Sequence, residues 1–184
     1  MIRTIAAGAF GLGILFTLAA LPAYADATGD VRAAMVKFLS LSSYEMSFGT
    51  GSRSGTVDIV KPHSRHVRTA TGEIISIGSD SYVRRRKGGW MKLPASTMGP
   101  TAAGAFENMD SLGRKVNGAT ATDLGTRNVD GETLHAYRVR DSSGHQVTVY
   151  IARDGFVHRV EDNSGPGAAR FSKFNAVPPI QAPM

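Results

Sequence analysis

Cysteine is absent from the 184 residues of this chain. Its absence excludes disulfide bridges, cysteine-ligated zinc or iron–sulfur sites, thiol nucleophiles and a lipid-modified N-terminal cysteine. The sequence also has no HExxH zinc motif, and Arg53 stands where a nucleophile elbow would need its serine. His63 and His66 are three residues apart in an extended stretch, so they point to opposite faces. We therefore expect no metal, no cofactor and no enzymatic activity.

The N-terminus has the pattern of an export signal. Met1 and Arg3 make a positive start, the apolar run Ile5–Leu21 follows, and Ala23-Tyr24-Ala25 has small residues at its first and third positions. These features together predict a signal peptide over residues 1–25 and a periplasmic mature protein. A retained membrane anchor is the alternative, but the run is shorter than a membrane-spanning helix requires.

The remaining chain has the composition of one folded domain. It is 42% hydrophobic and 20% charged overall, which suffices for a packed core, and the net charge of +6 favours anionic partners. We place a single domain at 26–177 and a proline-containing C-terminal tail at 178–184.

Two amphipathic helices are predicted. Asp30–Leu41 places Val31, Ala34, Met35, Phe38 and Leu39 on one stripe of a 3.6-residue period, with Thr28 or Asp30 as its N-terminal cap. A second helix is predicted over Pro100–Asn117, where Pro100 suits a first helical position.

The rest of the sequence predicts strands separated by glycine turns. Before residue 95 the expected strands are Tyr44–Thr50, Gly55–Lys61, Arg65–Ala70, Glu73–Ile77, Tyr82–Lys87 and Trp90–Leu93. In the C-terminal half, Asp130-Gly131 and Asp154-Gly155 predict two-residue hairpin turns.

Pairing Arg140 with His145 across a looser turn makes Ala136 face Val149 and Leu134 face Ile151. This register predicts one apolar face and one wet face. The predicted apolar face holds Leu134, Ala136, Val147, Val149, Ile151, Phe156, His158 and Val160, with Arg138 and Arg140 near its turn end, whereas Tyr137 and Tyr150 fall on the wet face.

The predicted fold class is α+β. About ten strands follow one another as a strongly curved antiparallel sheet, a half-open β-barrel, and the two helices cover its concave side.

This order of elements resembles the periplasmic lipoprotein-carrier (LolA/LolB/LppX-like) fold superfamily. The resemblance rests on the opening helix followed by Tyr44, on Val57–Pro62, on Ile77–Val83 leading to Gly89–Pro94, on Gly131–Val139, and on Asp154–Glu161. It implies a half-open barrel closed by helices, whose apolar hollow accepts the acyl chains of lipids or lipoproteins. Relatives with this fold also serve as sensors or as binding domains of envelope regulators.

The expected lipid-binding cavity is lined by apolar residues of the helices and of the concave sheet face. They are Met35, Phe38, Ile59, Ile77, Met91, Leu93, Phe106, Met109, Leu134, Val147, Val149, Ile151, Phe156 and Val160. The alternative is that these residues pack against one another in a closed core, because alternation alone does not distinguish the two.

A basic run predicts contact with an anionic headgroup or membrane surface. The candidates are Arg84, Arg85, Arg86, Lys87, Trp90, Arg138 and Arg140. The alternative is a solvated hairpin whose charges discourage edge aggregation. Nucleic acid is not an expected partner, because aromatic residues do not alternate with the basic ones.

Two functions remain open on the sequence. The first is an exported, non-catalytic carrier or sensor of a lipid or acylated lipoprotein. The second is an envelope interaction or stress-sensing module with a filled core, which binds a protein partner.

Overall fold

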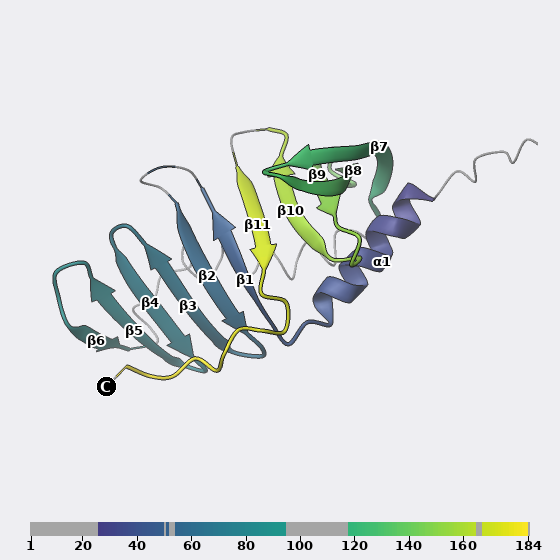
Figure 1. The fold of residues 1–184 in the computed structure, drawn as a ribbon. Helices are drawn as coiled ribbons and strands as arrows, with labels where there is room; N and C mark the ends of the chain where they lie inside the picture. Colours follow the sequence, from purple (N-terminus) through teal and green to yellow (C-terminus); the bar gives the residue numbers. More distant parts are fainter. Residues whose placement is uncertain (1–25, 50, 52–53, 95–117, 165–166, 184) are drawn as a thin grey trace, which may run out of the picture.

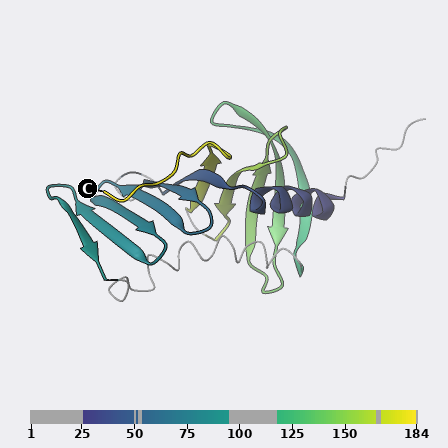
Figure 2. The same cartoon turned by 90° about the horizontal axis from the view of Figure 1, so that it is seen from below.

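The computed structural model describes residues 26–49, 51, 54–94, 118–164 and 167–183. The predicted signal peptide and the predicted helix at 100–117, with Phe106 and Met109, lie outside the described residues. The described chain forms one curved antiparallel sheet that does not close, with one helix on its concave side (Figures 1 and 2). The predicted curved antiparallel sheet with a helix on its concave side is confirmed, whereas the described residues do not include a second covering helix.

The elements run in the following order: α1 (Ala27–Leu39), β1 (Ser43–Phe48), β2 (Gly55–Val60), β3 (Ser64–Thr69), β4 (Gly72–Ile77), β5 (Asp80–Arg85), β6 (Trp90–Leu93), β7 (Thr120–Val129), β8 (Glu132–Arg140), β9 (Gln146–Ile151), β10 (Val157–Asp162) and β11 (Ala168–Ser172).

The eleven strands form two meanders joined in the middle. The order across the sheet is β6-β5-β4-β3-β2-β1-β11-β10-β9-β8-β7, so β1 pairs with β11 instead of with a neighbour in the later sequence. The predicted single sequential meander is therefore wrong at this point. Strand β11 was not predicted, and it is the strand that joins the two halves of the sheet.

The β8–β9 register differs by one residue from the predicted one. Arg140 pairs with Gln146 and Tyr137 pairs with Val149. The cause is the Asp141 carboxylate, which accepts hydrogen bonds from the backbone N–H groups of Ser143 and His145 and makes the loop one residue longer. A slip of one residue turns each side chain to the other face of the sheet. Tyr137 therefore points to the core, and the neighbouring Ala136 points to the other face.

The β9–β10 connection is also longer than predicted. The backbone N–H of Ala152 donates to the carbonyl of Phe156, and Gly155 has a φ of 77°, so three residues form the loop instead of two. Val157 therefore pairs with Ile151, and the pairing shifts between Val157 and Arg159. His158, which a two-residue turn would place opposite Ile151, therefore does not pair with it. The Asp130-Gly131 turn is confirmed, with positive φ at both residues.

Helix α1 begins three residues earlier than predicted and is capped by Asp26, whose side chain accepts from the backbone N–H of Thr28. Thr28 does not cap the helix. Its hydroxyl oxygen accepts from the backbone N–H of Ala121 and so ties α1 to β7. The predicted apolar stripe is confirmed for Val31, Ala34, Met35 and Phe38, which are all buried, but not for Leu39, which is 38% exposed. No helix among the described residues is long and apolar enough to cross a bilayer.

The core lies where α1 packs on the middle of the concave face. Phe38 contacts Tyr44 and Phe171, with ring centroids 4.8 and 5.0 Å apart. Strands β7–β11 curve around the helix, whereas β2–β6 extend beyond it (Figure 1). The described molecule thus has a half that encloses α1 and a half that α1 does not cover.

The segment after β11 crosses the ends of the first strands (Figures 1 and 2). The side-chain oxygen of Asn175 accepts from the backbone N–H and the hydroxyl of Ser42, at 2.8 and 2.9 Å. The backbone N–H of Asn175 donates to the carbonyl of Ser43, and Val177 is buried. This segment therefore fixes the chain end to the start of β1.

Candidate ligand-binding surfaces on the concave face

The antiparallel registers align concave-face side chains of β1–β6 into rows that cross the strands. One row, which we call the apolar row, consists of Met46, Val57, Val67, Ile74, Val83 and Met91. Its neighbour at the strand ends, the rim row, consists of Phe48, Gly55, Thr69, Gly72 and Arg85. Both rows result from the period of two along each strand.

Exposure rises along the apolar row with distance from α1. Met46 and Val57 are buried in the core, Val67, Ile74 and Val83 are half-buried, and Met91 is 58% exposed. We call these last four residues the open wall. Three strand spacings of about 4.8 Å make it about 14 Å wide.

A hollow of about 340 Å³ lies on the open wall. Val67, Ile74 and Val83 line it from the apolar row, and Thr69, Gly72 and Arg85 line it from the rim row. Gly72 is required here, because a Cβ at this position would lie 2.4 Å from the backbone oxygen of Arg84. Thr71, Glu73 and Arg84 complete the lining, so the hollow has an apolar floor with polar and charged residues at its edge.

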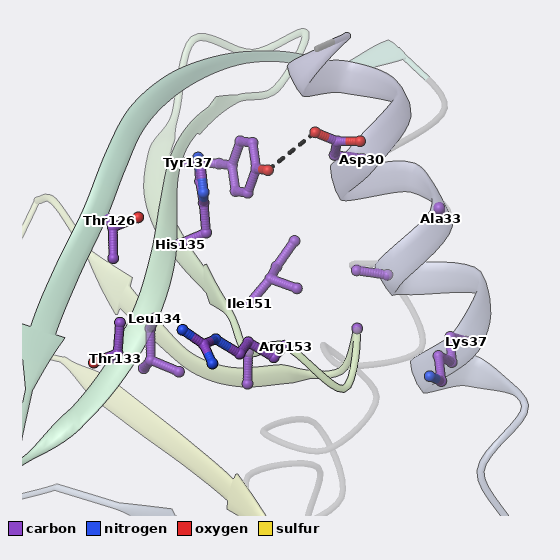
Figure 3. A pocket seen from close by; sticks show the side chains of 13 residues that line it. Asp30, Ala33, Lys37, Thr126, Thr133, Leu134, His135, Tyr137, Ile151 and Arg153 are labelled. Atoms are coloured by element: carbon purple, nitrogen blue, oxygen red, sulfur yellow. Dashed lines mark hydrogen bonds between the residues drawn. The ribbon is translucent and has the colours of Figure 1, made fainter.

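A second hollow of about 570 Å³ lies between α1 and the ends of β8 and β9, and we call it the helix cleft (Figure 3). Its lining combines polar residues, among them Lys37, Thr126, His135, Tyr137 and Arg153, with the apolar residues Ala33, Ala34, Leu134 and Ile151. An acyl chain finds a more apolar lining on the open wall, and each methylene needs apolar contact to gain free energy.

Several polar groups of the helix cleft already have partners. The Tyr137 hydroxyl donates to Asp30 at 3.0 Å, and the Lys37 ammonium donates to the carbonyl of Asp154 and lies 4.3 Å from the Phe156 ring centroid. Burial, together with the hydrogen bond to Asp30, raises the pKa of Tyr137 to about 12. Tyr137 is thus a neutral donor that fixes α1 to β8.

The middle of the concave face is filled. Four predicted cavity residues, Met35, Phe38, Ile59 and Val149, are buried in the core cluster, and Val147, Ile151, Phe156 and Val160 pack against it. Leu134 and Ile151 also line the helix cleft. Of the others, Met91 belongs to the open wall and Leu93 is half-buried, whereas Ile77 shares the convex face with Glu73 and so does not line the concave side as predicted. The residues predicted to line one cavity are thus divided among a closed core, the two hollows and, for Ile77, the opposite face.

The predicted headgroup residues are also divided. Arg84 and Trp90 lie on the convex face, where the Arg84 guanidinium is 4.9 Å from the Trp90 ring centroid and forms an ion pair with Glu73. Arg85 lies in the rim row, and Arg86 and Lys87 follow in the exposed turn. Arg138 and Arg140 alternate with Tyr137 and Val139, so neither arginine shares the apolar face as predicted.

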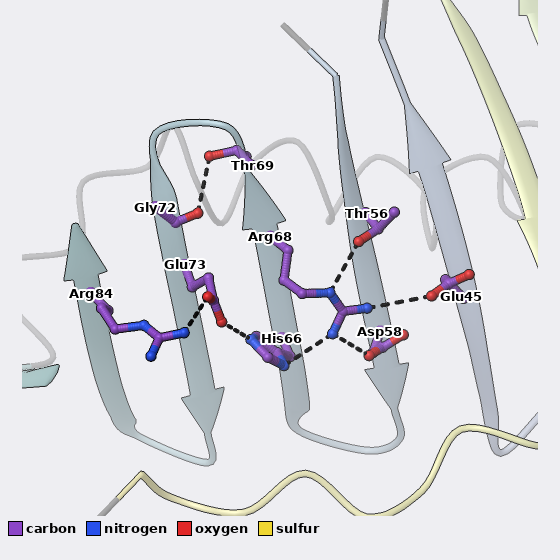
Figure 4. A network of polar contacts seen from close by, with 9 residues as sticks. All are labelled: Glu45, Thr56, Asp58, His66, Arg68, Thr69, Gly72, Glu73 and Arg84. Carbon is purple, nitrogen blue, oxygen red and sulfur yellow. Dashed lines mark hydrogen bonds and ion pairs between the residues drawn. The ribbon is translucent and has the colours of Figure 1, made fainter. Parts of the chain in front are cut away.

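A chain of polar contacts crosses the convex face of the same strands (Figure 4). Arg68 donates to Asp58 at 2.7 Å and to Thr56 at 3.2 Å, and Glu73 binds His66 and Arg84. Burial alone would raise the pKa of Asp58, but the hydrogen bond and charge of Arg68 outweigh it and hold that pKa below its ordinary value. The convex side of β2–β6 thus carries a connected polar network, beside which Ile75 is buried.

Within the described ranges, no group of three or more His, Asp or Glu side chains has the geometry of a metal site. His158 binds Glu132 at 2.7 Å and Asp154 at 3.0 Å and packs against Phe174. These contacts join the β7–β8 hairpin, the β9–β10 loop and the chain end, which is a structural role.

Known structures share this architecture. The chain is similar to lipoprotein LppX from Mycobacterium tuberculosis, with 16% identity, a TM-score of 0.57, and coverage of 84% of this chain and 97% of that one. It is also similar to LprF from Mycobacterium bovis, with 16% identity, a TM-score of 0.58, and coverage of 86% and 96%. No family model and no curated protein sequence matches the chain. The chain therefore has the lipoprotein-carrier fold that its sequence predicts.

Proposed function

We propose that this protein is an exported, non-catalytic binding protein that carries or senses a lipid or an acylated lipoprotein. The acyl chain lies along the open wall of β3–β6, in the hollow above Val67, Ile74 and Val83. The observation that supports this proposal most is the apolar row, which continues across the strands well beyond the reach of α1. A soluble protein gains nothing from such a surface unless a ligand covers it.

The free energy available on this surface is sufficient for a carrier. Burial contributes about 0.8 kcal/mol per methylene, so a sixteen-carbon chain supplies up to about 12 kcal/mol before the cost of ordering it. Met91 at the outer end of the row has a flexible and polarizable side chain that adapts to chains of different shape. Affinity therefore needs no polar motif.

The cellular location follows from the predicted signal peptide. Export through residues 1–25 places the mature chain in the periplasm, where lipids and lipoproteins pass between membranes. The shared fold with lipoprotein LppX agrees with an extracytoplasmic location.

The alternative function is an envelope interaction or stress-sensing module that binds a protein partner. The filled middle of the concave face favours it, because α1 packs there with Phe38, Tyr44 and Phe171 and leaves no continuous barrel interior. On this alternative the open wall would bind an apolar peptide segment instead of a lipid.

Native mass spectrometry of the chain purified from its own envelope by gentle extraction tests the proposal. We expect adducts whose masses are those of lipids or of an acylated peptide. A spectrum of the bare chain alone would contradict lipid carriage, and an adduct with the mass of an unmodified polypeptide would support the alternative.

A further inference from the structure

We infer that the cargo has an anionic head, a carboxylate or a phosphate, which binds Arg85 at the edge of the open wall. This inference rests on the proposed function and specifies the chemical class of the cargo. The site lies at the end of the hollow where Arg85 adjoins the apolar floor of Val67, Ile74 and Val83.

The register places the Arg85 side chain on the ligand side of the sheet. Arg85 pairs with Gly72, which pairs with Thr69, and these three residues form the end of the rim row beside Val67, Ile74 and Val83. All six residues line the same hollow. A chain lying on the apolar row therefore has its head within the reach of Arg85.

Gly72, opposite Arg85, lets β4 and β5 approach closely at this end, because a Cβ there would lie 2.4 Å from the backbone oxygen of Arg84. No side chain therefore stands between Thr69 and Arg85 in the rim row.

The charges at this end favour an anion. Among the described residues, Arg85, Arg86 and Lys87 form no ion pair, although all three are exposed and consecutive. The one carboxylate lining the hollow, Glu73, is engaged by Arg84 and His66 through its two side-chain oxygens. Adjacent residues of β5 thus differ, because the Arg84 charge is neutralised on the convex side and the Arg85 charge is not.

An arginine at such a position selects the head of the cargo by its charge and its geometry. Its planar guanidinium donates two parallel hydrogen bonds to a carboxylate or phosphate, and partial desolvation by the adjoining chain strengthens them. An uncharged head leaves this donor pair without an acceptor, so acyl chains with and without an anionic head should differ in affinity.

The test compares the fluorescent fatty acid parinaric acid with its methyl ester at pH 8, which differ only in the charge of the head. With the wild-type protein we expect the acid to bind about tenfold more tightly than the ester. Arg85→Gln should remove most of this preference, because it weakens the binding of the acid and leaves the affinity for the ester unchanged. Arg138→Gln is the matched control, because Arg138 is exposed, has no ion pair among the described residues and lies on the other side of the sheet.

The outcomes separate the two proposals. Equal affinity of wild-type protein for acid and ester overturns the anionic head and leaves lipid binding intact. A loss of preference in Arg138→Gln as large as in Arg85→Gln also overturns it, because the effect would then arise from net charge. Binding of neither ligand overturns the proposed function itself. Folding of both variants is checked by circular dichroism, and Arg85→Lys, which keeps the charge, should restore part of the preference.

Discussion

Tyr137 shows how a single residue links the helix to the sheet. It is 6% exposed, stacks on His135 with centroids 4.7 Å apart, and donates its hydroxyl to Asp30 in the first turn of α1. Asp30 is well placed there, because a carboxylate near a helix N-terminus is favoured by the helix dipole. The pair therefore fixes the start of α1 over β8.

The variant Tyr137→Phe removes the hydroxyl and leaves the ring. We expect the free energy of unfolding to fall by about 1 kcal/mol at pH 7, because Asp30 loses a hydrogen bond. The pKa of Tyr137 rises from 10.0 to about 12 on folding, so the stabilisation is complete below pH 10 and decreases as the pH rises toward 12. Urea denaturation at several pH values measures both effects.

The difference between wild type and Tyr137→Phe is the informative quantity, since other groups titrate in both proteins. That difference should be constant from pH 7 to 9 and should shrink above pH 10. Parallel stability profiles over the whole range would contradict the assigned hydrogen bond.

At the scale of elements, the segment after β11 holds the two meanders together. Asn175 adopts a φ of 56°, which asparagine tolerates better than most residues, and its side chain accepts two hydrogen bonds from Ser42. Phe174 stacks on Phe156 with centroids 4.7 Å apart. The chain end thus bonds to the start of β1 and packs beside β10.

The variants Asn175→Gly and Asn175→Asp separate the backbone from the side chain. Glycine keeps the positive φ and loses the acceptor, so we expect the free energy of unfolding to fall by about 1 kcal/mol and hydrogen exchange at the Ser42 amide to become faster. Aspartate keeps the acceptor oxygen, so the free energy of unfolding of Asn175→Asp should fall by no more than about 0.5 kcal/mol. Wild-type stability and exchange in Asn175→Gly would show that the segment contributes nothing.

Local patterns of the sequence predict the elements, and long-range contacts decide how they pair. The stripe of Val31, Ala34, Met35 and Phe38 identifies α1, and Asp130-Gly131 identifies its hairpin. The β8–β9 register was missed because it depends on how the Asp141 side chain closes the loop. Strand β11 was missed although Ala169 and Phe171 alternate in it with polar or small residues, since its partner β1 lies more than a hundred residues earlier.

The candidate site was predictable only in part for the same reason. Alternation identifies Val67, Ile74, Val83 and Met91 as apolar positions, but only the registers align them into one row. Met35 and Phe38 satisfy the same pattern and are packed in the core. Gly72 at the start of a predicted strand was the available signal for the close approach of β4 and β5, because a glycine within a strand often marks such an approach, but its place opposite Arg85 depends on the register.

At the scale of the whole molecule, the two halves of the sheet divide two tasks. The strands that curve around α1 bury most of the apolar core and supply stability, with Val157 and Phe171 fully enclosed. The strands beyond α1 have a network of polar contacts on their convex side, formed by Arg68 and its partners, and the apolar row on their concave side. Because stability is provided in one half, the other half can leave apolar surface open for cargo.

The measurement that tests this account most directly is the affinity for parinaric acid methyl ester in the variants Met91→Asp and Val36→Asp. Both side chains are exposed, 58% for Met91 on the open wall and 64% for Val36 on α1, so neither change should unfold the protein. We predict that Met91→Asp weakens binding at least tenfold, because a carboxylate would enter the apolar row, and that Val36→Asp binds as tightly as wild type. Equal affinities in the two variants would contradict the assignment of the open wall as the lipid-binding surface.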